Sequence, residues 1–172
     1  MQLKPRLFFD MDGTLAEYKF EGIEAYYDKG FFLELKPHEK VIKLAQEIIS
    51  NHKEIEVFTL SAVYTDSRYS VRDKNDWLDR NLPEIDMEHR IFTPCGQNKT
   101  DYLPGGLMPL DVLIDDFSPN LFKWRGFAAI KMRNGINGTK NTWKGYSIDK
   151  DADVSTNVAY ILNVFKAYQE KL

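Results

Sequence analysis

The amino-acid sequence predicts an α/β domain in which a five-stranded parallel sheet carries helices on both faces. Short hydrophobic runs alternate along the chain with segments whose apolar residues recur at helical spacing, which is typical of parallel sheets. The first run, residues 7–9, is continuously apolar, as expected of a strand that is buried on both faces. Three runs end in acidic or hydroxyl side chains, and in such folds the carboxyl ends of the strands form the ligand-binding edge.

The first half of the chain supplies two strands and one helix. Residues 7–9 form an apolar run that stops at an acidic residue, so we expect the first strand there. Residues 17–35 are rich in Tyr, Phe and Gly and show no period. Pro37 then favours the start of a helix, and the apolar residues after it have helical spacing: Val41, Ile42, Leu44, Ala45, Ile48 and Ile49. Residues 55–60, Ile-Glu-Val-Phe-Thr-Leu, are expected to form the second strand.

The second half continues the alternation of strands and helices. The expected elements are, in chain order, a helix at residues 67–82, strands at 90–92 and 111–114, a short helix at 120–124, a strand at 128–132, a loop at 133–145 and an amphipathic helix at 156–169. The loop is expected because it contains three Gly and three Asn. The sequence shows no repeat or linker, so we expect a single domain that spans residues 1–172.

The composition is that of a globular protein. Of its residues 43% are hydrophobic and 28% are charged, and the net charge of −3 disfavours a nucleic acid polymer as the main partner. No segment approaches the ~18 apolar residues of a membrane span, and Asp10 interrupts the N-terminal segment too early for a signal peptide. Cys95 is the single cysteine, which excludes an intrachain disulfide. We therefore expect a cytoplasmic protein without a membrane partner.

Asp10 and Asp12 supply the two carboxylates that phosphate ester hydrolysis can use. They follow the first strand two residues apart, so both side chains can point the same way, and Gly13 allows the backbone to turn directly afterwards. One carboxylate can attack phosphorus and form a mixed anhydride that water then hydrolyses. The other can protonate the leaving oxygen and later deprotonate the water.

Further side chains at the strand ends complete the chemistry. Asp115 and Asp116 follow the fourth strand, and clustered acids repel one another unless a cation lies between them. Oxygen ligands of this kind suit Mg²⁺. The phosphoryl oxygens also need a cation and a hydroxyl, and the order of elements offers Lys99 with either Ser61 or Thr59. Thr59 and Ser61 alternate onto one face of their strand, and of the two we favour Ser61.

These motifs resemble those of the haloacid dehalogenase (HAD) superfamily, whose core is a Rossmann-like sheet. The run Asp10-Met11-Asp12-Gly13-Thr14-Leu15 after a hydrophobic strand resembles the first motif. The strand end at Ser61 resembles the second motif, Lys99 the third and Asp115-Asp116 the fourth. The resemblance extends from residue 7 to residue 120.

The resemblance implies a role for each of these residues. Asp10 would be the nucleophile and Asp12 the acid and base, while Lys99 would stabilise the phosphoryl group. Mg²⁺ would be held by Asp10, the main-chain carbonyl of Asp12, and Asp116, with Asp115 behind them. Asp12 also favours phosphate ester hydrolysis within the superfamily, because the dehalogenases need no acid at that position.

Within the superfamily the chain is most similar to the 5'(3')-deoxyribonucleotidases, which implies a nucleoside monophosphate as its small phosphorylated substrate. The departure is the cap, because only residues 17–36 are free to form one after the first strand. A short cap leaves the site open, and a homo-oligomer would help to cover it. Aromatic side chains in this segment could either stack on a base or pack the cap, namely Phe20, Tyr26, Tyr27, Phe31 and Phe32.

Other interpretations of the same residues are weaker. Asp12-Gly13 could form a hairpin turn, but Asp10 and Asp115-Asp116 would then have no explanation. A sugar-phosphate or phosphoprotein phosphatase of the same superfamily would use the same site. A catalytically silent metal-binding module is the alternative from another class, and the joint presence of the Asp10, Asp12, Lys99 and Asp116 side chains disfavours it.

Overall fold

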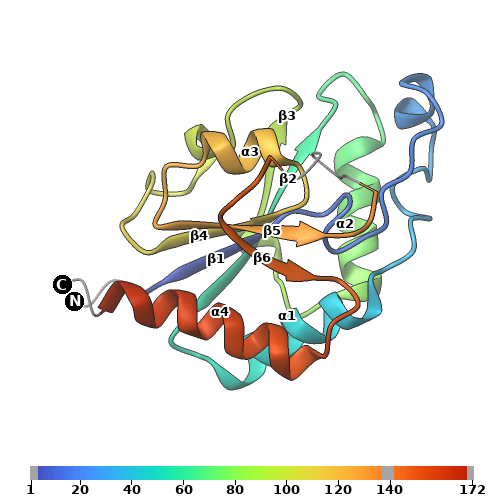
Figure 1. The fold of residues 1–172 in the computed structure, drawn as a ribbon. Coiled ribbons are helices and arrows are strands. Elements are labelled where there is room, and N and C mark those ends of the chain that lie inside the picture. The colour runs from blue at the N-terminus through green and yellow to red at the C-terminus, as the bar shows by residue number, and fades with distance from the viewer. Residues whose placement is uncertain (1–3, 137–141, 170–172) are drawn as a thin grey trace.

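The computed structural model describes residues 4–136 and 142–169, and in these residues the chain forms one parallel sheet with helices on both faces (Figure 1). The six strands of the described part are β1 (Arg6–Phe9), β2 (Glu56–Val63), β3 (Arg90–Pro94), β4 (Asp111–Asp115), β5 (Ala128–Arg133) and β6 (Tyr146–Asp149). Their order is β3-β2-β1-β4-β5-β6, and every neighbouring pair is parallel. β1 lies centrally, with Phe9 beside Thr59 of β2 and Ile114 of β4.

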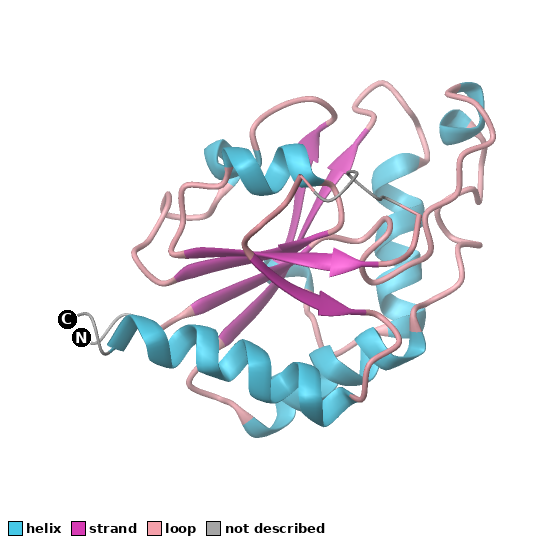
Figure 2. Ribbon diagram, in the orientation of Figure 1, coloured by secondary structure: helices cyan, strands magenta, loops and turns pink. Residues whose placement is uncertain are grey.

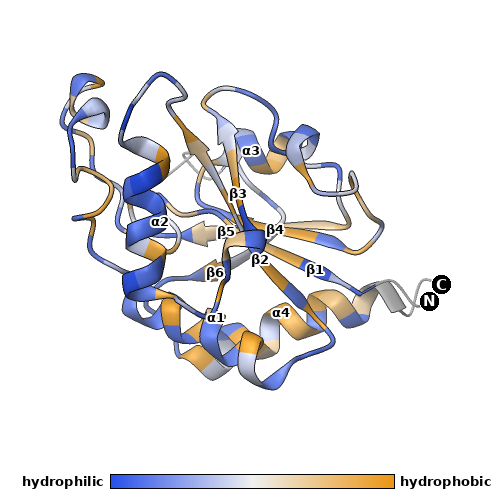
Figure 3. Cartoon of the chain, turned by 180° about the vertical axis from the view of Figure 1, so that it is seen from behind, coloured by the Kyte–Doolittle hydropathy of each residue, from blue (hydrophilic) through white to orange (hydrophobic). Residues whose placement is uncertain are grey.

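Alternating side chains of the strands build a core on each face of the sheet. The helices are α1 (Glu39–Asn51), α2 (Ser70–Asn81), α3 (Ser118–Lys123) and α4 (Val154–Gln169). Leu7 and Phe9 belong to the core that contains side chains of α1, α2 and α4. Phe8 points to the other face, where it joins Leu121 of α3. Figure 2 shows these two layers around the sheet, and Figure 3 shows hydrophobic residues along the strands.

The expected fold class is confirmed, but the expected count of five strands is wrong by one. The sequence predicts no strand at β6, because only Ile148 of its four side chains is buried and no apolar run marks it. Pairing with β5 creates this strand at the sheet edge. β2 also continues three residues past its expected end, which places Ser61 inside the strand. Residues 137–141 of the expected loop lie outside the described residues.

The insertion after β1, residues 17–36, begins and ends at one place. The main-chain N–H of Glu17 donates to the carbonyl of Lys36 at 2.8 Å, which closes the segment at its base. Its only helical turn within these residues is the 3-10 turn η1 (Glu24–Tyr27). Helix α2 holds the segment at two points, because the Asp73 carboxylate accepts from the Gly30 N–H and the Trp77 indole donates to the Leu35 carbonyl, both at 2.7 Å. The insertion is therefore fixed against α2, beside which it lies in Figure 1.

None of the helices in the described residues is sufficiently long and apolar to span a lipid bilayer.

Candidate active site

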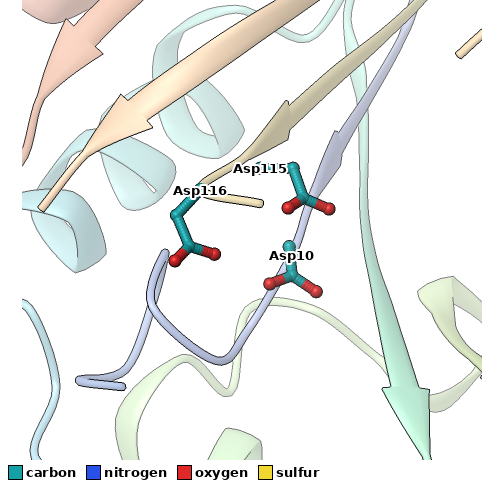
Figure 4. A group of neighbouring side chains, drawn as sticks. All are labelled: Asp10, Asp115 and Asp116. Atoms are coloured by element: carbon teal, nitrogen blue, oxygen red, sulfur yellow. The ribbon is translucent and has the colours of Figure 1, made fainter. Parts of the chain in front are cut away.

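Three buried carboxylates meet where β1 and β4 end. Asp10 follows β1, Asp115 ends β4 and Asp116 follows it, and the three each offer an oxygen within 4.8 Å of the others. Figure 4 shows the three side chains facing a common space. The two strands are neighbours, and the Asp10 N–H donates to the Ile114 carbonyl at 2.9 Å. The chain order reverses between β1 and β4, which is where sheets of this kind bind ligands.

Lys99 opens the 3-10 turn η3 (Lys99–Tyr102) and brings a buried ammonium into the cluster. Its Nζ lies 2.6 Å from Asp10 Oδ1 and 2.7 Å from Asp115 Oδ2. Burial alone would lower the pKa of Lys99, but Asp10 and Asp115 outweigh it and raise that pKa above its usual range. Lys99 therefore stays positively charged at neutral pH.

The positive charge of Lys99 does not fully offset the burial of Asp10 and the negative charges around it. Burial raises the pKa of the Asp10 carboxyl well above its usual range, and Lys99 opposes this. The nearby carboxylates of Asp115, Asp12 and Asp116 raise the pKa further. An additional cation between these oxygens would favour the charged form of Asp10, so the cluster has the chemistry of a metal-binding site.

Asp115 and Asp116 have different surroundings. The two oxygens of Asp115 accept from Lys99, from the Phe117 N–H at 2.7 Å and from Asn120 Nδ2 at 2.9 Å. Protein donors thus surround Asp115, which suits a carboxylate that orients its neighbours. Asp116 Oδ2 accepts from Asn134 Nδ2 at 2.9 Å.

Asn134 also connects the two loops that carry the acids. Its Nδ2 donates at 2.9 Å both to Asp116 Oδ2 and to the main-chain carbonyl of Gly13. Lys131 donates to the Asp116 carbonyl from the same strand end, and its pKa is lowered, mainly by burial. The end of β5 therefore fixes Asp116 and the turn after β1 relative to one another.

Asp12 faces a second buried lysine rather than the three-acid cluster. Its Oδ2 accepts from Lys74 Nζ of α2 at 2.5 Å, while its Oδ1 has no hydrogen-bond partner in the described residues. Lys74 donates its remaining hydrogens to Ser61 Oγ at 2.8 Å and to the Ala62 carbonyl at 2.7 Å. Thr59 is fully buried, and its hydroxyl is also unpartnered within the described part of the chain.

A cavity of about 330 Å³ adjoins these groups and joins an acidic end to an aromatic wall. The acidic end includes Asp10, Asp12, Lys99 and Asp116. Aromatic and other side chains complete the lining: Tyr18, Lys19, Tyr26, Phe31, Phe32, Leu35, Ala62, Tyr64, Cys95, Phe117 and Asn120. A cavity of this size and mixed lining fits a small ligand with one anionic and one apolar part.

The aromatic wall contains three of the five aromatic residues that the sequence suggested for base stacking. Tyr26 stacks on Phe32 with ring centroids 5.9 Å apart and on Tyr64 with centroids 5.2 Å apart. Burial raises the pKa of Tyr64 to about 12, so its hydroxyl remains protonated at neutral pH. Phe20 is 63% exposed and, like Tyr27, does not line the cavity. The other suggested residue, Phe31, lines it together with Tyr26 and Phe32.

Sequence reasoning missed Lys74, which lies inside a run of charged residues that resembles a solvated helix face. One signal was present. Trp77 and Leu78 lie three and four positions after Lys74, so all three share one face of α2, and all three are buried. A lysine on the apolar face of a helix indicates a specific partner.

Comparisons with known proteins agree with the fold and identify a family. The family model described as "5' nucleotidase, deoxy (Pyrimidine), cytosolic type C protein" matches residues 19–154, which contain Ser61, Lys74, Lys99 and Asp115-Asp116. The fold is similar to that of the HAD domain of effector protein Lem4 from Legionella pneumophila (inactive mutant), with a TM-score of 0.53. That similarity covers 99% of this chain and 100% of the other at 14% identity. No curated protein matches the sequence.

Proposed function

Because the chain belongs to the 5' nucleotidase, deoxy (Pyrimidine), cytosolic type C family of HAD-type phosphomonoester hydrolases, we propose that it hydrolyses (deoxy)nucleoside 5'-monophosphates through a phosphoryl-aspartate on Asp10. The observation that supports this most strongly is the cavity, which joins an acidic, lysine-containing end to an aromatic wall. The acidic end suits a phosphate with its metal ion, and the aromatic wall suits a planar base.

In the first step a carboxylate oxygen of Asp10 attacks phosphorus. The bond from phosphorus to the ester oxygen breaks, and a proton from Asp12 passes to that oxygen, so the nucleoside leaves as an alcohol. In the second step water attacks phosphorus and gives its proton to the Asp12 carboxylate. The bond between Asp10 and phosphorus then breaks, which releases inorganic phosphate and restores both carboxyl groups.

Lys99 and Ser61 would bind the phosphoryl oxygens. Lys99 retains its charge because its pKa is raised, and it lies beside the attacking carboxylate of Asp10. Ser61 Oγ accepts from Lys74, which leaves its hydroxyl hydrogen available to a phosphate oxygen. Thr59 lies one alternation earlier on the strand, and only Ser61 shares a hydrogen-bonding lysine, Lys74, with Asp12, so Ser61 is the better candidate.

The donor set fits Mg²⁺. Three buried carboxylates converge, and burial raises the pKa of Asp10 well above its usual range even with Lys99 in contact. We assign Asp10, Asp116 and the main-chain carbonyl of Asp12 as ligands, with Asp115 orienting Lys99 and Asn120 behind them. When bound, Mg²⁺ would supply positive charge that offsets the charge of the transferred phosphoryl group.

The insertion, residues 17–36, would serve as a minimal cap within a single domain. Its Tyr26, Phe31 and Phe32 form the aromatic wall with Tyr64, and stacking on such a wall contributes ~1–3 kcal/mol per base. Stacking tolerates different bases, so we expect modest discrimination among nucleotides. The description of the family as cytosolic supports a cytoplasmic location.

A comparison of kcat/KM across substrates tests this function. Nucleoside 5'-monophosphates should exceed both ribose 5-phosphate and a phosphopeptide, since only they carry a base for the aromatic wall. Phe31→Leu should reduce kcat/KM for the nucleotides and leave that for ribose 5-phosphate nearly unchanged. Equal or better hydrolysis of ribose 5-phosphate would replace this proposal with a general small-molecule phosphatase.

A further inference from the structure

Lys74 is a fully buried lysine whose three ammonium hydrogens all have partners. Its Nζ donates to Asp12 Oδ2, to Ser61 Oγ and to the Ala62 carbonyl, at 2.5–2.8 Å. A buried ammonium is unfavourable unless every hydrogen is bonded, and an apolar side chain of similar length would fill the same space without that penalty. The position of Lys74 therefore calls for an explanation beyond packing.

The contact with Lys74 makes the two carboxylate oxygens of Asp12 different from one another. Oδ1 is buried and has no hydrogen-bond partner in the described residues, so the 26% of the Asp12 side chain that is exposed does not lie at Oδ1, and Lys74 holds the other oxygen, Oδ2. Asp12 lines the cavity. A proton that moves to a leaving oxygen must come from a carboxylate with a defined orientation. The charge-assisted bond from Lys74 to Oδ2 provides that orientation.

The same ammonium connects Asp12 to the neighbouring strand and to the cap. Its bonds to Ser61 and Ala62 fix the end of β2. Ser61, which would donate to phosphate, and Asp12, which would protonate the leaving oxygen, are therefore held by the same lysine. Lys74 Nζ also lies 4.5 Å from the ring centroid of Phe32, within range of a cation–π contact.

We propose that Lys74 is a positioning residue that orients Asp12, through its bond to Oδ2, for proton transfer to the leaving oxygen. This inference rests on the proposed function, because it assigns Lys74 a part in the same reaction. A positioning role differs from a purely structural role in one respect. Loss of Lys74 should reduce activity most with substrates whose leaving oxygen needs a proton.

The test compares two substrates in Lys74→Met and wild-type protein. A nucleoside 5'-monophosphate has a poor leaving oxygen that needs a proton, while p-nitrophenyl phosphate has a good one that does not. General acid catalysis contributes about 10²–10⁴-fold. We therefore expect kcat/KM of Lys74→Met to fall about 10²-fold for the nucleotide and less than about tenfold for the aryl ester. The parameter kcat/KM reports the step in which the leaving group departs.

The matched control is Arg72→Met, which removes an exposed cation from the same helix and should leave both substrates unaffected. The double variant Asp12→Asn/Lys74→Met should lose no more nucleotide activity than Asp12→Asn alone, because Lys74 acts through Asp12. If Lys74→Met does not fold, Lys74→Gln, which keeps two hydrogen-bond donors without the charge, takes its place in both comparisons.

Equal losses for the two substrates, or additive losses in the double variant, would overturn the role of Lys74. The proposed function fails in a different way. If wild-type protein hydrolyses neither ester, or if Asp12→Asn shows no dependence on the leaving group, the acid role of Asp12 is wrong and the proposal for Lys74 falls with it.

Discussion

Gly13 lies so close to Asp116 that a methyl group on its Cα would overlap the Asp116 carboxylate. The backbone of Gly13 also has a φ of +85°, which favours glycine over other residues. Asn134 joins the same two residues by donating to the Gly13 carbonyl and to Asp116 Oδ2. The turn after β1 and the end of β4 are therefore in direct contact, and this contact sets the spacing of the acids.

Gly13→Ala should disturb Asp116 as well as strain the backbone. The strain alone costs about 1–2 kcal/mol, and Gly96 provides the control because it has the same φ of +85° with no atom within 4 Å of a Cβ. We expect Gly13→Ala to lower kcat/KM more than tenfold and to raise the Mg²⁺ concentration needed for half activity. Gly96→Ala should lose stability with little change in either quantity. Matching effects on activity would contradict direct contact as the cause.

Ser61→Ala should lower activity, whereas Thr59→Val should not. Ser61→Ala removes a hydroxyl proposed to bind phosphate, so transition-state binding should weaken by about 1–3 kcal/mol, measured as kcat/KM. The Thr59 hydroxyl is buried and has no partner in the described residues. Thr59→Val should therefore leave activity unchanged and keep or raise the free energy of unfolding by up to about 1 kcal/mol. Loss of activity in Thr59→Val with a benign Ser61→Ala would reverse the assignment.

Mg²⁺ should raise the melting temperature, because it binds a folded site that the unfolded chain lacks. A chelator should abolish turnover, and Ca²⁺ should restore it poorly since it prefers more ligands and looser geometry. Asp116→Asn should lose the shift in melting temperature, whereas Asp76→Asn, at a partly exposed acid on α2, should retain it. Full activity in chelator, with metal content verified, would exclude the magnesium site.

His89 should stabilise the fold in a pH-dependent way. Burial alone would lower its pKa, but hydrogen bonds to Asp86 at 2.6 Å and Glu56 at 3.1 Å outweigh burial and raise the pKa above 6.5. A raised folded-state pKa means that the stabilisation is complete below pH 6.5 and is lost as the pH rises through the folded value. Urea unfolding across this range should show that the difference between wild type and His89→Gln shrinks with rising pH. A difference that stays constant would show that protonation of His89 adds nothing.

The sequence was sufficient to predict the elements whose identity depends on local pattern. Buried strands that end in acids predicted the positions of Asp10 and Asp115, because parallel neighbours end at the same edge. β6 escaped prediction because its pairing with β5, rather than its composition, makes it a strand. Lys74 escaped because its partner Asp12 lies 62 positions earlier in the chain, and such contacts exist only after folding.

The two hydroxyls of β2 show a related limit. Alternation placed Thr59 and Ser61 on one face of the strand, which is as far as a two-residue period can lead. What separates them is their partners, because Lys74 reaches Ser61 and leaves Thr59 without a hydrogen bond in the described residues. The position of helix α2 against β2 determines which hydroxyl Lys74 reaches, and that position is a tertiary property.

The phosphoryl-aspartate on Asp10 is the central claim, and chemical trapping measures it directly. Protein quenched in acid during turnover of a nucleoside monophosphate is reduced with borohydride, which converts an acyl phosphate into an alcohol, and its peptides are weighed by mass spectrometry. We predict homoserine at position 10 in wild-type protein, and neither this product nor significant turnover in Asp10→Asn. An unmodified Asp10 during active turnover, together with near-normal activity of Asp10→Asn, would contradict the mechanism.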